Sequence, residues 1–194
     1  FLTQYGISMS LAVKIYQEYG PKTYQVVQEN PYRLADDISG IGFKMADEIA
    51  GRIGIHTNSD YRIRSGLLYV LLQAAAEGHT CLPREMLLRR ASELLRVAEE
   101  DIEVQMMNLC MDRKLILKEK NDQTMVFYSQ YYYMELNTAR MLHDLNLTCR
   151  MEEEDILKKL QAVERQEKME LDEMQRRAVV ESVKNGLLIL TGGP

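Results

Sequence analysis

The 194-residue sequence is poor in several residue types that mark particular classes of protein. It has no tryptophan, and its three cysteines lie 29 and 39 residues apart, at Cys81, Cys110 and Cys149. These spacings fit neither a zinc site nor a disulfide framework, and an odd count predicts free thiols in a reducing compartment, the cytoplasm. The three histidines are scattered too, without acidic partners at a metal-ligand spacing: His56, His79 and His143. We therefore expect no metal site.

Long apolar runs and targeting signals are missing as well. No window approaches the roughly eighteen consecutive apolar residues of a membrane span, and the start, Phe1–Tyr5, does not resemble a signal peptide. The first residue is not methionine, and the last is Pro194. We interpret both ends as boundaries within a longer protein, and we expect a monomer without membrane association.

A positive net charge, common in nucleic-acid-binding proteins, is also lacking. The 24 Lys and Arg residues against 29 Asp and Glu residues give a net charge of -5. The deficit lies in one stretch, because residues 134–173 hold six basic and eleven acidic residues, whereas residues 1–64 hold seven of each. Net charge thus neither supports nor excludes DNA binding by the first segment, so any such binding must come from local geometry.

Glycine and proline divide residues 1–57 into short helices. Ser8 or Ser10 is expected to cap a first helix that ends at Gly20-Pro21, since a glycine followed by proline terminates helices. A second helix is predicted over about 22–29. A third follows the Gly-x-Gly turn at 40–42, because apolar residues recur there at helical spacing.

Residues 58–133 predict a helical and winged-helix-like region. A helix over 60–77 has apolar residues on one face, namely Ile63, Leu67, Leu68, Leu71 and Leu72. An extended piece at 80–82, helices over about 83–95 and 99–113, and strands over 115–119 and 124–129 outline a winged helix. Four arginines of these helices are candidates for phosphate contacts: Arg84, Arg89, Arg90 and Arg96. A packing or partner-docking role fits equally well, because the segment holds nine acidic and eight basic residues.

The remaining residues predict helices over about 131–147, 156–168 and 172–184, and then a short strand at Leu187–Leu190. Its unbroken apolar run is what a strand buried on both faces needs. We regard Tyr131-Tyr132-Tyr133 as packing residues rather than a base-stacking platform. The expected fold is mainly α: tandem helix-hairpin-helix (1–57), winged-helix-like with a β-hairpin (58–133), helical linker (134–168), and the first helix and strand of a truncated P-loop α/β motor domain (169–194).

The glycine-rich turn before the third helix resembles the hairpin of a helix-hairpin-helix fold. Two glycines allow a tight turn, Ile41 between them is expected to pack inward, and the free N–H groups face outward, where they can hold a phosphate. Such a site binds DNA backbone with little regard for sequence. The candidate DNA-binding residues are Gly40, Ile41, Gly42, Phe43 and Lys44, with a weaker earlier copy at Gly6, Ile7 and Ser8. The alternative is a tight interhelical turn without DNA contact.

Further cations near these hairpins are candidates to extend the contact with DNA, although each alone is more typical of a solvated surface charge: Arg33, Arg52, Arg62 and Arg64.

At the other end of the chain, Thr191-Gly192-Gly193-Pro194 follows the predicted strand, as the phosphate loop of a P-loop ATPase does. Gly192 then corresponds to the first glycine of G-x-x-x-x-G-K-[ST]. The candidate nucleotide-binding residues are Gly192, Gly193, Pro194 and Gln175, whose amide can both donate to and accept from adenine.

The chain resembles the N-terminal region of a RecD-like (RecD/TraA family) superfamily 1 DNA helicase of the bacterial type. The resemblance covers essentially the whole chain, including an L-x-x-x-Q-x-x-A pattern at 171–178, and four other segments carry it: Asn30–Leu34, Gly40–Asp47, Glu77–Thr80 and Ile189–Pro194. It implies a 5′-to-3′ DNA helicase driven by ATP and Mg²⁺ and acting in repair or recombination. It also implies that Gln175 meets adenine and that Gly192 opens the phosphate loop.

The implied partners are single-stranded or forked DNA and possible repair proteins. Because the 194 residues hold neither the catalytic lysine nor a second motor domain, we expect them to contain no catalytic residues, to bind no nucleotide and to hydrolyse no ATP. The alternative is a stand-alone, non-catalytic helix-hairpin-helix module that docks on DNA or on a repair partner.

Overall fold

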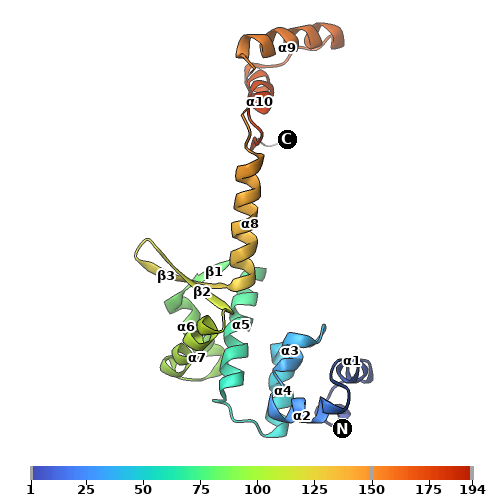
Figure 1. Cartoon of the computed structure of the whole chain (residues 1–194), viewed down its shortest axis with the longest axis vertical. Helices are drawn as coiled ribbons and strands as arrows, with labels where there is room; N and C mark the ends of the chain where they lie inside the picture. The colour runs from blue at the N-terminus through green and yellow to red at the C-terminus, as the bar shows by residue number, and fades with distance from the viewer. Residues whose placement is uncertain (1, 149–150, 193–194) are drawn as a thin grey trace. The chain divides into compact units, whose positions relative to one another are not determined.

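The computed structural model describes residues 2–148 and 151–192, and its contacts divide the chain into two units, Phe1–Tyr133 and Met134–Pro194. The first unit begins with short helices, shown in blue in Figure 1: η1 (Leu2–Tyr5), α1 (Met9–Tyr19), η2 (Gly20–Lys22), α2 (Thr23–Glu29), α3 (Arg33–Asp37) and α4 (Phe43–Ile53). It continues with α5 (Asp60–Ala76), β1 (Cys81–Pro83), α6 (Arg84–Leu95), α7 (Glu99–Met111), β2 (Leu115–Lys120) and β3 (Gln123–Tyr128). Three short helices, η1, η2 and α3, are not among the elements that the sequence predicts.

The ends of the helices follow from local sequence. Ser8 caps α1, as its hydroxyl accepts from the Leu11 N–H at 3.4 Å, and Gly20 ends that helix with a φ of 54°. Gly54 ends α4 in the left-handed conformation that glycine adopts without strain. The predicted cap and stop of α1 are thus confirmed.

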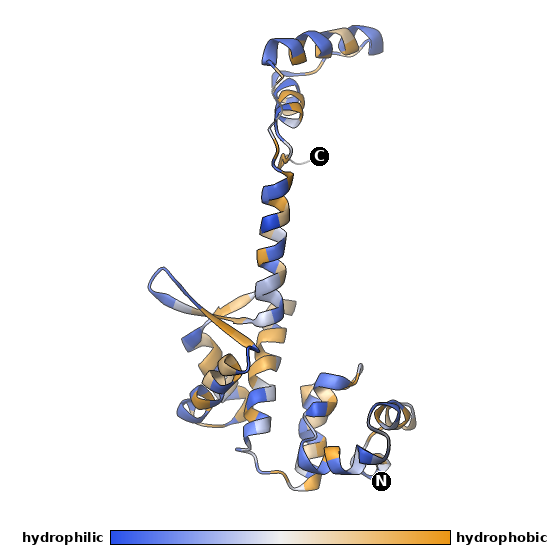
Figure 2. Ribbon diagram, viewed as in Figure 1, coloured by the Kyte–Doolittle hydropathy of each residue, from blue (hydrophilic) through white to orange (hydrophobic). Residues whose placement is uncertain are grey.

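The three strands form an antiparallel sheet in the order β1-β3-β2. Together with α5, α6 and α7, which contact one another, they have the connectivity of a winged helix, as predicted. Asn121 and Asp122 join β2 to β3 with φ values of 51° and 60°, which suits a two-residue hairpin turn. Figure 2 shows that the tip of this hairpin is hydrophilic.

Two clusters of buried apolar residues form the core of the first unit. One holds α1, α2, α3 and α4 together, and it includes Ile15, Val27, Leu34 and Ile49. The larger cluster joins α4 to α5, α6, α7 and the sheet. Close packing of α5 on α6 depends on Gly66, because a Cβ atom there would lie 2.6 Å from Cδ2 of Leu95. Leu72, expected on the buried face of α5, is exposed, since a helix of this length buries only one side against its neighbours.

Helix α8 (Ser129–Leu145) runs from the first unit into the second, which also contains α9 (Glu153–Glu167) and α10 (Glu173–Lys184). The buried Glu164 carboxylate accepts from the Leu171 N–H at 2.9 Å and from Nε of Arg176 at 3.2 Å, joining α9 to α10. These bonds lower the pKa of Glu164. No helix among the described residues is long and apolar enough to cross a membrane.

The predicted strand at Leu187–Leu190 is wrong for this structure. The segment is not a strand, and the exposed fractions of Ile189 and Leu190 are 80% and 76%. A strand needs a neighbour to satisfy its N–H and C=O groups. Among residues 2–148 and 151–192, the only pairing near this segment is one isolated bridge between Thr148 and Asn185. The start of a motor domain therefore stays a prediction.

Candidate nucleic-acid interface

The two glycine hairpins have the same local geometry, 34 residues apart in the sequence. Gly6 and Gly40 both have positive φ values, 81° and 101°, and the following Ile7 and Ile41 are 3% and 4% exposed. Each isoleucine is followed by an extended residue and then by an eleven-residue helix, α1 or α4. The expected inward packing of Ile41 is confirmed, and the earlier hairpin is as well formed as the later one.

The amide groups at the start of α4 are suited to bind an anion. The N-cap residue of this helix is Gly42, and no side chain among the described residues caps its first turn. The free N–H groups and the helix dipole favour a negative group there. Lys44 is exposed in the first turn and adds a full positive charge. In α1, by contrast, the Ser8 hydroxyl already occupies one amide.

The need for glycine differs between the two positions of the later hairpin. Gly40 lies in the left-handed region, whereas Gly42 has a φ of -103° and a ψ of 174°, which other residues adopt as well. A Cβ atom at Gly42 would meet nothing within 4 Å. The expectation that both glycines serve the tight turn is therefore correct only for Gly40.

Three candidate DNA-binding residues bury their side chains. Phe43 lies in the core between Tyr32 and Tyr69, with ring centroids 6.0 and 5.2 Å apart. Ile7 and Ile41 are buried as well. The Ile41 N–H also donates to the carbonyl oxygen of Ile38 at 3.1 Å, so this amide is not free for a ligand either.

Ion pairs separate the seven cations of residues 1–64 into two groups. Arg62 makes a two-point contact with Asp47, at 2.7 and 3.0 Å, and Arg64 pairs with Asp112. Arg33 pairs with Asp37 at 3.5 Å and lies over the Tyr19 ring. Four others are exposed without an ion pair within residues 2–148 and 151–192: Lys14, Lys22, Lys44 and Arg52. The arginines that sequence reasoning grouped together thus have different roles.

The winged-helix arginines are mostly occupied by protein carboxylates. Arg84 pairs with Glu103, Arg89 with Glu93, and Arg90 with Glu77. Arg96 ends α6 in the left-handed conformation. These pairings favour the packing interpretation of this segment over phosphate contact.

The tyrosines at the start of α8 pack against the sheet, as the packing interpretation requires. Tyr131 and Tyr132 are half-buried and make edge contacts with Tyr128 and Phe127, at centroid distances of 6.1 and 5.4 Å. Tyr133 is exposed and contacts Tyr132. They therefore form no row of stacking rings.

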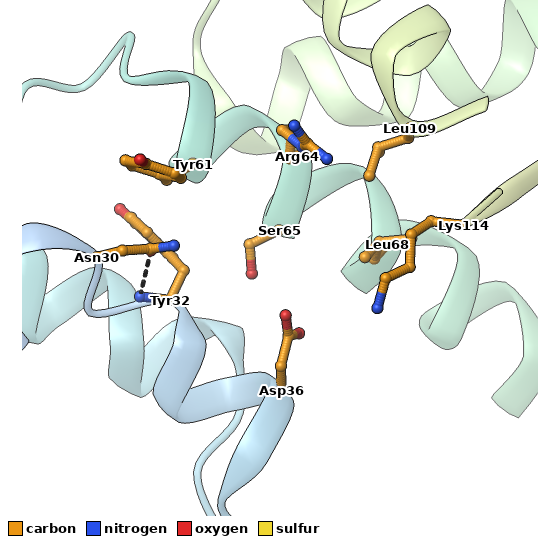
Figure 3. A pocket seen from close by; sticks show the side chains of 9 residues that line it. All are labelled: Asn30, Tyr32, Asp36, Tyr61, Arg64, Ser65, Leu68, Leu109 and Lys114. Atoms are coloured by element: carbon orange, nitrogen blue, oxygen red, sulfur yellow. Dashed lines mark hydrogen bonds between the residues drawn. The ribbon is translucent and has the colours of Figure 1, made fainter. Parts of the chain in front are cut away.

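A cavity of about 230 Å³ lies between the hairpin helices and α5 and α7. Its walls carry both charges, as Figure 3 shows: Asp36 approaches from one side, and Lys114 and Arg64 from the other. Partial burial raises the pKa of Asp36, and the Lys114 charge partly offsets this rise. Sequence reasoning missed this cavity because its residues come from separate segments that only tertiary packing brings together: Asn30, Tyr32, Asp36, Tyr61, Arg64, Ser65, Leu68, Leu109 and Lys114.

The candidate nucleotide-binding residues lie in the second unit. Gln175 is exposed in the first turn of α10, where its amide oxygen accepts from the Asp172 N–H at 3.1 Å while Asp172 accepts from the Gln175 N–H at 2.8 Å. This capping box gives the glutamine a structural role. Gly192 is exposed, and Gly193 and Pro194 lie outside the described residues. Within residues 2–148 and 151–192, no group of three metal-ligating side chains is placed to hold a metal ion.

Two hairpins with positive-φ glycines and buried isoleucines, each leading into a helix, are the features of a tandem helix-hairpin-helix domain. Residues 1–81 match the family model described as the ATP-dependent RecD2 DNA helicase HHH domain. The match extends from the first hairpin through α5 to the start of β1. Residues 1–81 are therefore similar to the helix-hairpin-helix region of RecD-like helicases.

Proposed function

We propose that this chain is the N-terminal DNA-handling part of an ATP-dependent 5′-to-3′ DNA helicase that acts in repair or recombination. The observation that carries the proposal is the repeated hairpin geometry in the region that matches the RecD2 family model. Two such hairpins present backbone N–H groups, which bind phosphate and not base edges. The expected ligand is therefore DNA backbone, single-stranded or forked, without sequence preference.

Electrostatics support local rather than global attraction. The net charge of -5 gives no long-range electrostatic attraction to DNA. Lys44 and the uncapped start of α4, however, together make one local region of positive potential. Because the contacts are few, binding is expected to be weak and sensitive to salt.

We further propose that ATP and Mg²⁺ serve the parent protein through the region that begins near α10. There Gln175 is proposed to read adenine, and Gly192, Gly193 and Pro194 to open the phosphate loop. The Gln175 amide is exposed, which fits this role, but its oxygen must leave the capping box before it can accept from adenine. The 194 residues contain no glycine-lysine pair after Gly192, so we expect no ATP hydrolysis from them alone.

The test is a fluorescence-anisotropy titration of labelled single-stranded and forked DNA at low salt. Lys44→Glu is expected to weaken binding about tenfold, the equivalent of about 1.4 kcal/mol for one charge-assisted contact. Gly40→Asp is expected to weaken it as well, because a carboxylate then faces the phosphate. The matched control is Lys22→Glu, which makes the same charge change at an exposed lysine beyond the far end of α1. If the unmutated chain does not bind DNA, the proposal fails.

A second candidate is the non-catalytic docking module. Three apolar residues spaced along one face of α1 are exposed, Met9, Val13 and Tyr16. Two of them, Met9 and Tyr16, line a groove of about 420 Å³. Exposed apolar faces of this kind mark protein contacts. Absence of DNA binding, together with capture of a repair-protein partner that Tyr16→Glu abolishes, would favour this candidate.

A further inference from the structure

Arg52 lies against the first hairpin although it belongs to the helix of the second. A Cβ atom built on Gly6 would lie 2.3 Å from Nη1 of Arg52 and 3.2 Å from its Cζ. The guanidinium group thus covers the Cα atom of Gly6, the positive-φ residue of the first hairpin. Arg52 is in the last turn of α4, whose first turn carries Lys44.

The first hairpin lacks a cation at the position that corresponds to Lys44 of the second hairpin. With the 34-residue offset, Gly6 corresponds to Gly40 and Ser10 corresponds to Lys44. Ser10 is neutral, and its hydroxyl lies 3.1 Å from the hydroxyl of Ser8. A positive charge at this hairpin therefore has to come from elsewhere in the fold.

Arg52 is free to supply this positive charge. It is exposed, and within residues 2–148 and 151–192 no carboxylate lies within 4.0 Å of its guanidinium. By contrast, Arg33, Arg62 and Arg64 are all held by aspartates. A guanidinium without an acidic partner keeps its donors free for the two-point contact that phosphate accepts.

We propose that Arg52 is the phosphate-binding cation of the first hairpin, so that α4 supplies one cation to each hairpin, Lys44 from its first turn and Arg52 from its last. The inference rests on the proposed DNA binding and deepens it. A side chain at position 6 would displace the guanidinium, in addition to the strain that a φ of 81° imposes on it.

The experiment measures how the affinity of the full 194-residue chain for a labelled single-stranded oligonucleotide depends on salt. Each phosphate contact on single-stranded DNA contributes about 0.7 to the slope of log K against log salt. Arg52→Gln and Lys44→Gln are each expected to lower the slope by about 0.7, and the double variant by about 1.4. Arg52→Lys is expected to keep the slope, because it keeps the charge. The matched control, Lys22→Gln, removes an exposed cation away from the hairpins and is expected to change nothing.

The outcomes separate the inference from the function on which it rests. If Lys44→Gln lowers the slope and Arg52→Gln does not, Arg52 is no phosphate contact, while DNA binding by the hairpins stands. A loss of affinity in Arg52→Gln with an unchanged slope also overturns the inference, because it indicates a packing role. Thermal melting followed by circular dichroism checks that Arg52→Gln folds as well as the unmutated chain. No binding by the unmutated chain refutes the proposed function itself.

Discussion

Arg62 makes the contact whose removal we expect to cost the first unit the most stability. Its Nε and Nη2 donate to the Asp47 carboxylate at 2.7 and 3.0 Å, and its Nη1 donates to the carbonyl oxygens of Thr57 and Leu95 at 2.9 and 2.8 Å. The Tyr32 hydroxyl donates to the same carboxylate at 2.7 Å. One guanidinium therefore joins α4, the α4–α5 loop, α5 and the end of α6.

The change Arg62→Met keeps the aliphatic stem and removes every one of these donors. The exposed fractions of the Arg62 and Asp47 side chains are 13% and 27%, so the carboxylate loses its partner in a poorly solvated place. Breaking a fully buried pair costs roughly 3–5 kcal/mol. Partial exposure places this one near the lower limit, and we expect the free energy of unfolding to fall by about 3 kcal/mol. The melting temperature is expected to fall by roughly 10 °C.

The assay is urea denaturation followed by circular dichroism, with Arg33→Met as the matched control. The Arg33–Asp37 pair is longer, at 3.5 Å, and its side chains are 53% and 35% exposed. Such a surface pair contributes about 0–1 kcal/mol. Equal losses in the two variants would refute the reasoning that burial of the Arg62 pair sets its contribution.

Two other predictions concern stability. Gly66→Ala is expected to cost about 1–3 kcal/mol of unfolding free energy, because the new methyl group would overlap Leu95; a urea titration that shows no loss would contradict the close packing of α5 on α6. Burial, and then hydrogen bonds to aspartates, raise the pKa values of Tyr19 and Tyr32 above the ordinary value. The unfolded phenols ionise near pH 10 while the folded ones stay protonated, so the unfolding free energy should fall as the pH rises above about 10. A flat profile there, in denaturation titrations at several pH values, would contradict this.

Features that depend on residues close together in the sequence could be predicted from it. The cap at Ser8, the stop at Gly20, the turn before α4 and the β2–β3 hairpin all follow from residues a few positions apart. The inward packing of Ile41 follows from the same local geometry.

Contacts between residues that are distant in the sequence could not be predicted from it. Nothing in the sequence pairs Arg62 with Asp47 and the carbonyl of Leu95, or places Arg52 on Gly6, because tertiary packing alone brings these groups together. The apolar composition of Leu187–Leu190 predicts a strand, but a strand exists only with a partner strand beside it.

The most direct test of DNA binding by the hairpins is amide mapping by NMR, in which single-stranded DNA is titrated into the isotope-labelled chain. The account predicts that the amide resonances of Gly42–Met45 shift most, with a second set at Gly6–Met9, while those of α6 and α7 stay in place. Shifts confined to α6 and α7, or the absence of any shift at the two hairpins, would contradict it.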